Sequence, residues 1–143
     1  MRHVLQTQQF DRKTITKIFE LATSLEGKRD TSLSGKILAS VFYTPSTRTR
    51  LSFESAMHRL GGDVISVENA LESSSQTKGE TLEDTIRTLN NYADAILLRH
   101  NEVGAAKRAA KHATVPIINA GDGNTGQHPT QALLDLYTIE REV

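Results

Sequence analysis

Apolar positions along the chain follow two spacings, one typical of helices and one typical of buried strands. From Asp11 to Glu26 apolar side chains recur every three or four residues, which predicts an amphipathic helix with Asp11 as its N-cap. Farther along, short apolar and β-branched runs alternate with helical patterns, and each run predicts a buried strand. These runs are Lys36 to Tyr43, Asp63 to Val67, Ala95 to Leu98 and Val115 to Asn119.

The segments between these strands have helical spacing and recognisable ends. Gly61-Gly62 ends the first, Thr81 begins the second as a capping residue, and Pro129 is a favourable first residue for the last. The predicted helices are Thr47 to Leu60, Thr81 to Tyr92, Val103 to His112 and one that starts at Pro129. Strands joined by helices pair in parallel, so we expect a three-layer α/β fold with a mostly parallel sheet of about four strands, helices on both faces, and ligands at the carboxyl ends of the strands.

The chain length predicts one domain, residues 1–143. The last helical pattern runs to Val143 without a glycine cap or a breaker, so we expect a truncated chain that lacks a second domain. The charges, 17 Lys and Arg against 17 Asp and Glu, provide no overall basic field for a nucleic acid or a membrane surface. The absence of cysteine and of an apolar leader or spanning run is typical of a cytoplasmic protein.

The segment Ser46-Thr47-Arg48-Thr49-Arg50 carries the strongest chemical signal, because it follows an apolar strand and opens a helix. A helix N-terminus presents free backbone N–H groups and the positive end of the helix dipole. Three hydroxyl groups and two guanidinium groups are added at the same point. This combination predicts a site for a phosphate.

Two further groups are predicted to face the same strand-end crevice. His128 and Gln131 lie about one turn apart at the start of the last helix, where they can form a neutral hydrogen-bonding pair. Arg99 follows the strand Ala95 to Leu98 and carries a permanent charge, whereas His100 is predicted to be structural or solvent-facing. The remaining histidines have no partner at ligand spacing, so no metal or other cofactor is expected.

Two loops allow competing interpretations. Gly121 to Gly126 matches the spacing of a dinucleotide-binding loop, but Pro129 places the helix start beyond the glycines, and no later strand carries a ribose-binding acid. A dinucleotide site is therefore a weaker alternative. The polar loop Glu72 to Glu80 is typical of a solvated surface segment, although Lys78 could present an ammonium group to a phosphate.

Taken together, these motifs resemble the transcarbamoylase family, and within it the aspartate transcarbamoylases. The resemblance rests on Ser46 to Arg50, Lys78-Gly79-Glu80-Thr81, Arg99-His100 and His128-Pro129-Thr130-Gln131, in that order. It runs from Leu5 to the end and covers only the carbamoyl-phosphate-binding half of the family's catalytic chain. Ornithine transcarbamoylase shares the Ser-x-Arg-Thr-Arg core, but Thr130 and the lysine loop favour aspartate as the acceptor.

The resemblance implies roles for individual residues. The phosphate would be bound by Ser46, Thr47, Arg48 and Thr49, and Arg99 would bridge it to the carbamoyl oxygen. His128 and Thr49 would face that oxygen, and Gln131 the carbamoyl nitrogen. Ser74 and Lys78 would reach the site of a neighbouring subunit in a homotrimer, where Lys78 would touch both phosphate and aspartate.

The implied reaction is transfer of the carbamoyl group from carbamoyl phosphate to L-aspartate, giving N-carbamoyl-L-aspartate and phosphate in pyrimidine synthesis. The isolated chain would lack most of the aspartate site and would be inactive alone. Regulatory subunits or a dihydroorotase are conceivable partners. The alternatives are an ornithine transcarbamoylase half-domain and a non-catalytic anion-binding or dinucleotide-binding module.

Overall fold

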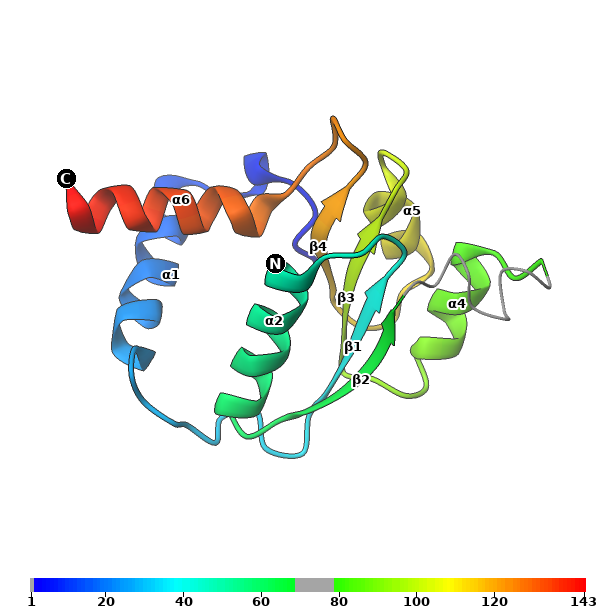
Figure 1. Ribbon diagram of the computed structural model, residues 1–143, viewed down its shortest axis with the longest axis horizontal. Coiled ribbons are helices and arrows are strands. Elements are labelled where there is room, and N and C mark those ends of the chain that lie inside the picture. Colours follow the sequence, from blue (N-terminus) through cyan, green and yellow to red (C-terminus); the bar gives the residue numbers. More distant parts are fainter. Residues whose placement is uncertain (1, 69–78) are drawn as a thin grey trace.

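The computed structural model, which describes residues 2–68 and 79–143, contains one sheet of four parallel strands (Figure 1). The strand order is β2-β1-β3-β4. Their bounds are Ile37–Phe42 for β1, Asp63–Glu68 for β2, Ala95–His100 for β3 and Ile117–Asp122 for β4. The predicted α/β fold with a parallel sheet is confirmed, and the strands β3 and β4 extend two or more residues farther toward their carboxyl ends than the sequence indicated.

Helices cover both faces of the sheet. Their bounds are Arg12–Leu25 for α1, Thr47–Arg59 for α2, Leu82–Leu89 for α4, Ala105–His112 for α5 and Pro129–Glu142 for α6, preceded by a short 3-10 helix, η1, at Thr7–Gln9. The predicted N-caps are confirmed, since Asp11 accepts a hydrogen bond from the Thr14 N–H at 2.8 Å and Thr81 accepts one from the Asp84 N–H at 3.2 Å. The helix α4 ends at Leu89 instead of Tyr92, where the chain turns toward β3.

The alternation of side chains along each strand divides the core into two clusters. Odd-numbered residues of β1, such as Ala39 and Val41, pack with buried residues of α4 and α5, including Ile86 and Ala109. Even-numbered residues such as Phe42 pack on the opposite face with Met57 of α2. Because both faces are covered, the central strand β1 is apolar except at Ser40, and β3 is apolar as far as Leu98, before Arg99 and His100.

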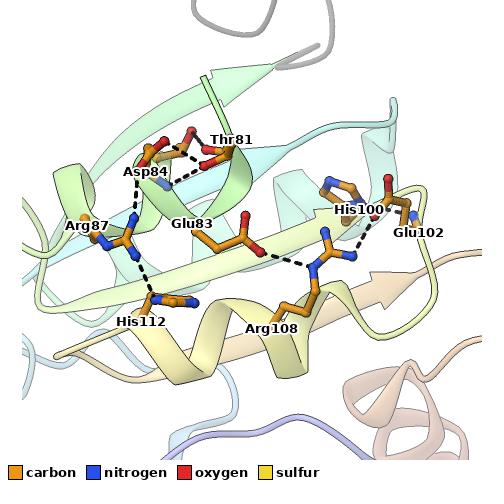
Figure 2. Close-up of polar contacts among 9 residues, drawn as sticks. Thr81, Glu83, Asp84, Arg87, His100, Glu102, Arg108 and His112 are labelled. Carbon is orange, nitrogen blue, oxygen red and sulfur yellow. Dashed lines mark hydrogen bonds and ion pairs between the residues drawn. The ribbon is translucent and has the colours of Figure 1, made fainter. Parts of the chain in front are cut away.

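Polar contacts connect α4 to α5 at the edge of the core cluster that contains Ile86 and Ala109. Figure 2 shows Arg108 of α5 between Glu83 of α4 and Glu102, at 3.2 and 2.7 Å. On the same helices, Arg87 contacts Asp84 at 2.7 Å and the ring of His112 at 3.2 Å. These pairs are largely exposed, so we attribute the packing of α4 on α5 mainly to the buried apolar residues beneath them.

The N-terminal segment adds a feature that the sequence pattern did not indicate. Val4 pairs in parallel with Ile118 and so extends the sheet beyond β4. The backbone N–H of Val4 donates to the Ile117 carbonyl at 2.8 Å, and the Val4 carbonyl accepts from the Asn119 N–H at 2.8 Å. One residue is too short a run to produce a strand pattern, which explains why it was missed.

The helices α1 and α6 lie side by side at one end of the sheet (Figure 1). Phe19 packs edge-on against Tyr137 with ring centroids 5.1 Å apart, and the Thr23 and Tyr137 hydroxyls lie 2.9 Å apart. Within the described residues, no helix has the length and apolar character needed to cross a membrane.

Candidate anion site at the strand ends

The N-terminus of α2 lines a pocket of about 1030 Å³ at the carboxyl edge of the sheet. Ser46 occupies the N-cap position, yet its side chain makes no capping hydrogen bond to the helix. The first turn therefore keeps backbone donors that can bind an anion. The pocket is lined by Pro45, Ser46, Thr47, Arg48, Thr49, Ser52, Phe53, Ala56, Arg99, His128, Thr130, Gln131 and Leu134.

The two arginines of the α2 segment have different environments. Arg50 lies 3.6 Å from Glu54 and 3.3 Å from Glu68, so acidic groups already neutralise its charge. Arg48 lines the pocket and takes part in none of the ion pairs found among the described residues. The expectation of two guanidinium groups at the anion site is therefore corrected to one from this segment, because Arg50 faces the end of β2.

Arg99 extends from β3 across the end of β4 and supplies a second cation. Its Nη1 donates to the Ala120 carbonyl at 2.9 Å, which fixes the guanidinium beside the pocket. Its Nε is buried and has no partner among the residues that the structure describes. Arg99 is half-buried, held by the Ala120 carbonyl, and has no carboxylate partner within residues 2–68 and 79–143. Such an oriented cation is a favourable anion ligand, because little reorganisation is needed when the anion arrives.

His128 is the N-cap residue of α6 and shares the pocket with Arg99. Burial lowers the pKa of its imidazole, the positive charge of Arg99 lowers it further, and Asp135 opposes both effects. The ring is therefore neutral near pH 7. Its Nδ1 lies 3.4 Å from the Thr130 hydroxyl, and in the tautomer in which Thr130 donates to Nδ1, Nε2 carries a proton that it can donate to a ligand.

Gln131 lines the same pocket, as its position one turn after His128 predicted. Its Nε2 donates to Asp135 Oδ1 at 2.8 Å. Because Asp135 binds the amide nitrogen, the amide oxygen is the group of Gln131 left to accept a hydrogen bond from a ligand.

The glycine loop supports the site instead of forming a dinucleotide site. A Cβ on Gly121 would lie 2.7 Å from Arg99 Nη1, and one on Gly123 would lie 2.6 Å from Val103 Cγ2. A Cβ on Gly126 would collide with the Asp122 carbonyl oxygen. All three glycines leave room for neighbouring protein atoms, and α6 begins at Pro129 beyond the loop, so no helix N-terminus is placed to bind a pyrophosphate here.

His100 is buried, so the solvent-facing alternative is wrong and the structural one is confirmed. Only 5% of the residue is exposed, its ring centroid lies 4.4 Å from that of Tyr43, and Nδ1 accepts from the Glu102 N–H at 3.0 Å (Figure 2). Ser74 and Lys78 lie outside the described residues, so their predicted roles stay predictions. Among the described residues, no cluster of three or more His, Asp or Glu could bind a metal ion.

Sequence reasoning missed the residues that hold the pocket walls. Phe53 and Leu134 line the pocket, but no role was predicted for them, because an apolar residue on a helix carries no signal for a ligand. Asn119 and Asp122 form hydrogen bonds to Gln127, the residue that precedes His128 of the pocket. A polar residue at the end of an apolar strand, as at Asn119, was the available signal.

Comparisons with known proteins show the family to which the chain belongs. Residues 2–141 match the family described as aspartate/ornithine carbamoyltransferase, carbamoyl-P binding domain. Over 145 residues the chain is 63% identical to aspartate carbamoyltransferase 1, chloroplastic, from Pisum sativum, an alignment that covers 98% of this chain and 37% of that protein.

Two solved structures are also similar. The catalytic subunit of Methanocaldococcus jannaschii aspartate transcarbamoylase has a TM-score of 0.92 and 54% identity, covering 99% of this chain and 47% of that one. Aspartate transcarbamoylase from Trypanosoma cruzi in complex with carbamoyl phosphate and aspartate has a TM-score of 0.92 and 42% identity over the same shares. The chain thus spans less than half of the length of each of these relatives.

Proposed function

The chain belongs to the carbamoyl-phosphate-binding domain family of the aspartate and ornithine carbamoyltransferases, and we propose that it binds carbamoyl phosphate in the pocket between α2 and α6. The observation that carries this proposal is the convergence of three different groups on one pocket. These are the uncapped N-terminus of α2, the oriented cation of Arg99 and the neutral imidazole of His128.

The phosphate end of the ligand fits the α2 side of the pocket. Backbone N–H groups and the side chains of Ser46, Thr47, Arg48 and Thr49 provide donors and a positive charge there. Arg99 lies between this region and α6, so its planar guanidinium can bond both a phosphate oxygen and the carbamoyl oxygen.

The carbamoyl end fits the α6 side. His128 and Thr49 donate to the carbamoyl oxygen, while the free amide oxygen of Gln131 accepts from the carbamoyl NH2 group. A neutral imidazole suits this position, because a hydrogen bond from it strengthens as negative charge develops on the oxygen.

We propose that the complete protein transfers the carbamoyl group to L-aspartate. The α-amine attacks the carbamoyl carbon, the bond from that carbon to the bridging phosphate oxygen breaks, and the amine proton passes to the departing phosphate. The products are N-carbamoyl-L-aspartate and phosphate. Thr49, Arg99 and His128 stabilise the negative carbonyl oxygen, so positioning and electrostatics provide the rate enhancement. The names of the similar proteins support aspartate as the acceptor.

The assembly and location of the protein belong to the same proposal. A homotrimer would bring Ser74 and Lys78 of one subunit to the site of the next, and regulatory or dihydroorotase subunits could associate with it. The composition favours the cytoplasm, whereas the pea relative is named as chloroplastic. Sedimentation across a range of concentrations tests the trimer, and a stable monomer or closed dimer near millimolar concentration would contradict it.

Calorimetric titration with carbamoyl phosphate, inorganic phosphate and NAD tests the binding proposal. We expect the first two to bind, with carbamoyl phosphate the tighter, and NAD not to bind. Arg48→Ala should weaken both, while Arg59→Ala, at the exposed C-terminal end of the same helix, is the matched control. Equal effects of the two variants, or tight NAD binding, would refute the proposed site.

A complementation assay tests the acceptor. The chain alone should carbamoylate neither aspartate nor ornithine, because half of the site cannot position the amine. Addition of a separately made C-terminal domain should restore turnover with aspartate, and Lys78→Ala should abolish it while the exposed-helix variant Lys111→Ala should not. Turnover with ornithine would favour the alternative transferase, and full turnover by the chain alone would contradict the division of the site.

A further inference from the structure

The peptide units on both sides of Gln127 are held by two buried polar side chains that approach from β4. Asp122 Oδ1 accepts from the Gln127 N–H at 2.8 Å, and Asn119 Nδ2 donates to the Gln127 carbonyl at 3.2 Å. The Gln127 carbonyl also accepts from the Asp122 N–H at 3.3 Å. Both side chains are almost fully buried, with 0% of Asn119 and 4% of Asp122 exposed. Gln127 immediately precedes His128, so these bonds hold the backbone from which the His128 side chain extends.

Each of the two side chains also bonds a second segment. Asn119 Nδ2 donates to the Leu5 carbonyl at 3.0 Å, and its Oδ1 accepts from the Gly121 N–H at 2.9 Å. Asp122 Oδ2 accepts from the Gly104 N–H at 2.9 Å. Gly104 is the N-cap of α5, where the helix dipole favours a negative charge, so the buried carboxylate is satisfied without a cation.

The two residues between Asn119 and Asp122, Ala120 and Gly121, contact Arg99, the cation of the site. The Ala120 carbonyl accepts from Arg99 Nη1, and Gly121 lies directly beneath Arg99 and His128. The same four-residue stretch therefore determines the position of the cation and, through Gln127, that of the imidazole.

We propose that Asn119 and Asp122 are positioning residues that hold His128 and Arg99 at the spacing required by the carbamoyl group. The inference rests on the proposed function, since it concerns the carbamoyl end of the same ligand. The phosphate end is assigned mainly to α2, and no hydrogen bond found among the described residues joins α2 to Asn119 or Asp122. Disturbing the pair should therefore change the preference for carbamoyl phosphate over inorganic phosphate, which general destabilisation would not do.

Asp122→Asn is the sharpest test, because it changes one acceptor oxygen into an NH2 group at constant shape. Only one oxygen then remains for the backbone N–H groups of Gly104 and Gln127. The N–H group that does not bond this oxygen faces the new NH2 group, which is itself a donor. We expect the affinity for carbamoyl phosphate to fall about tenfold, while the affinity for inorganic phosphate changes less than about threefold.

Asn90→Asp is the matched control at the opposite edge of the sheet. Asn90 also bridges segments, donating to the His112 carbonyl and accepting from the Thr114 N–H, both at 2.9 Å. It should lower stability without changing the ratio of the two affinities. An unchanged ratio in folded Asp122→Asn, or an equal change in Asn90→Asp, would overturn the inference. If Asp122→Asn does not fold, the ratio of the affinities for carbamoyl phosphate and inorganic phosphate is measured for Asn119→Ser, and an unchanged ratio there would overturn the inference.

The ring signals of His128 in NMR spectra separate this inference from the proposed function. They are recorded without ligand, at several pH values, for the unsubstituted chain and the variants. Asp122→Asn should shift these signals, because the imidazole moves relative to its neighbours, whereas Asn90→Asp should leave them unchanged. If the unsubstituted chain fails to bind carbamoyl phosphate, the proposed function is refuted, and unchanged His128 signals in Asp122→Asn would independently refute the positioning role.

Discussion

Substitution of Gly121 by alanine tests whether the close approach of this backbone position holds Arg99 and His128 in place. Gly121 has a φ of +111°, a conformation that residues with a Cβ rarely adopt. The added methyl group would lie 2.7 Å from Arg99 Nη1 and 3.3 Å from His128 Cδ2. The guanidinium must move, since a carbon and a nitrogen atom cannot approach so closely.

Two costs follow from this geometry. The backbone strain lowers the free energy of unfolding by about 1–3 kcal/mol. Displacement of Arg99 also weakens its 2.9 Å bond to the Ala120 carbonyl, and a hydrogen bond of a charged group contributes about 1.5–3 kcal/mol. If a similar amount is lost between Arg99 and the ligand, the affinity for carbamoyl phosphate falls by about tenfold to a hundredfold.

Gly35→Ala is the matched control, because Gly35 also has a positive φ, +75°, but no atom lies within 4 Å of an added Cβ. It should show the strain alone, with about 1–2 kcal/mol less stability and unchanged affinity. Guanidinium chloride denaturation measures the free energy of unfolding, and calorimetry measures carbamoyl phosphate binding. Equal affinities of folded Gly121→Ala and Gly35→Ala would refute the claim that Gly121 makes room for Arg99.

Three further outcomes are expected. Arg99→Ala should weaken carbamoyl phosphate binding more than His128→Ala, because charge-assisted bonds contribute about 1.5–3 kcal/mol and neutral ones about 1; equal losses by calorimetry would count against this assignment. Ser40→Ala should keep or raise the melting temperature, since the buried Ser40 hydroxyl has no partner among the described residues; a marked fall would show that a partner exists. Burial lowers the pKa of His100, so the unfolded state binds more protons below about pH 6.5 and stability should fall there. His100→Asn should reduce that dependence in denaturation curves and His58→Gln, an exposed control, should not, whereas the same pH dependence in both variants would contradict the assignment to His100.

Most of the fold could be predicted because each element carries its own local signal. The strand Ile37–Phe42 is an apolar run, and α1 has both helical spacing and an N-cap, so neither depends on distant residues to be recognised. The end of α4 and the pairing of Val4 with Ile118 could not be predicted, because both are decided by contacts with other segments. Element ends are fixed by such contacts more than by propensity.

The candidate site could be predicted in part for the same reason. An arginine at a strand end and a helix N-terminus with hydroxyl residues are local features, so Arg99 and Ser46 to Thr49 were found. The separate environments of Arg48 and Arg50 were not, because Glu68, which helps to neutralise Arg50 of α2, lies on a different element, the strand β2. The network of Asn119 and Asp122 joins residues more than a hundred positions apart, as in the bond to Leu5.

The sequence by itself determined the order and type of the elements and the chemical groups at their ends, because hydrophobic spacing and helix caps act over a few residues. Only the tertiary structure decided which of these groups share a pocket, which charges are already neutralised, and why the glycine loop is filled by Arg99 and Asp122 instead of a nucleotide. Those outcomes depend on distances across the sheet. Strand order and side-chain packing set such distances, and no short stretch of sequence encodes them.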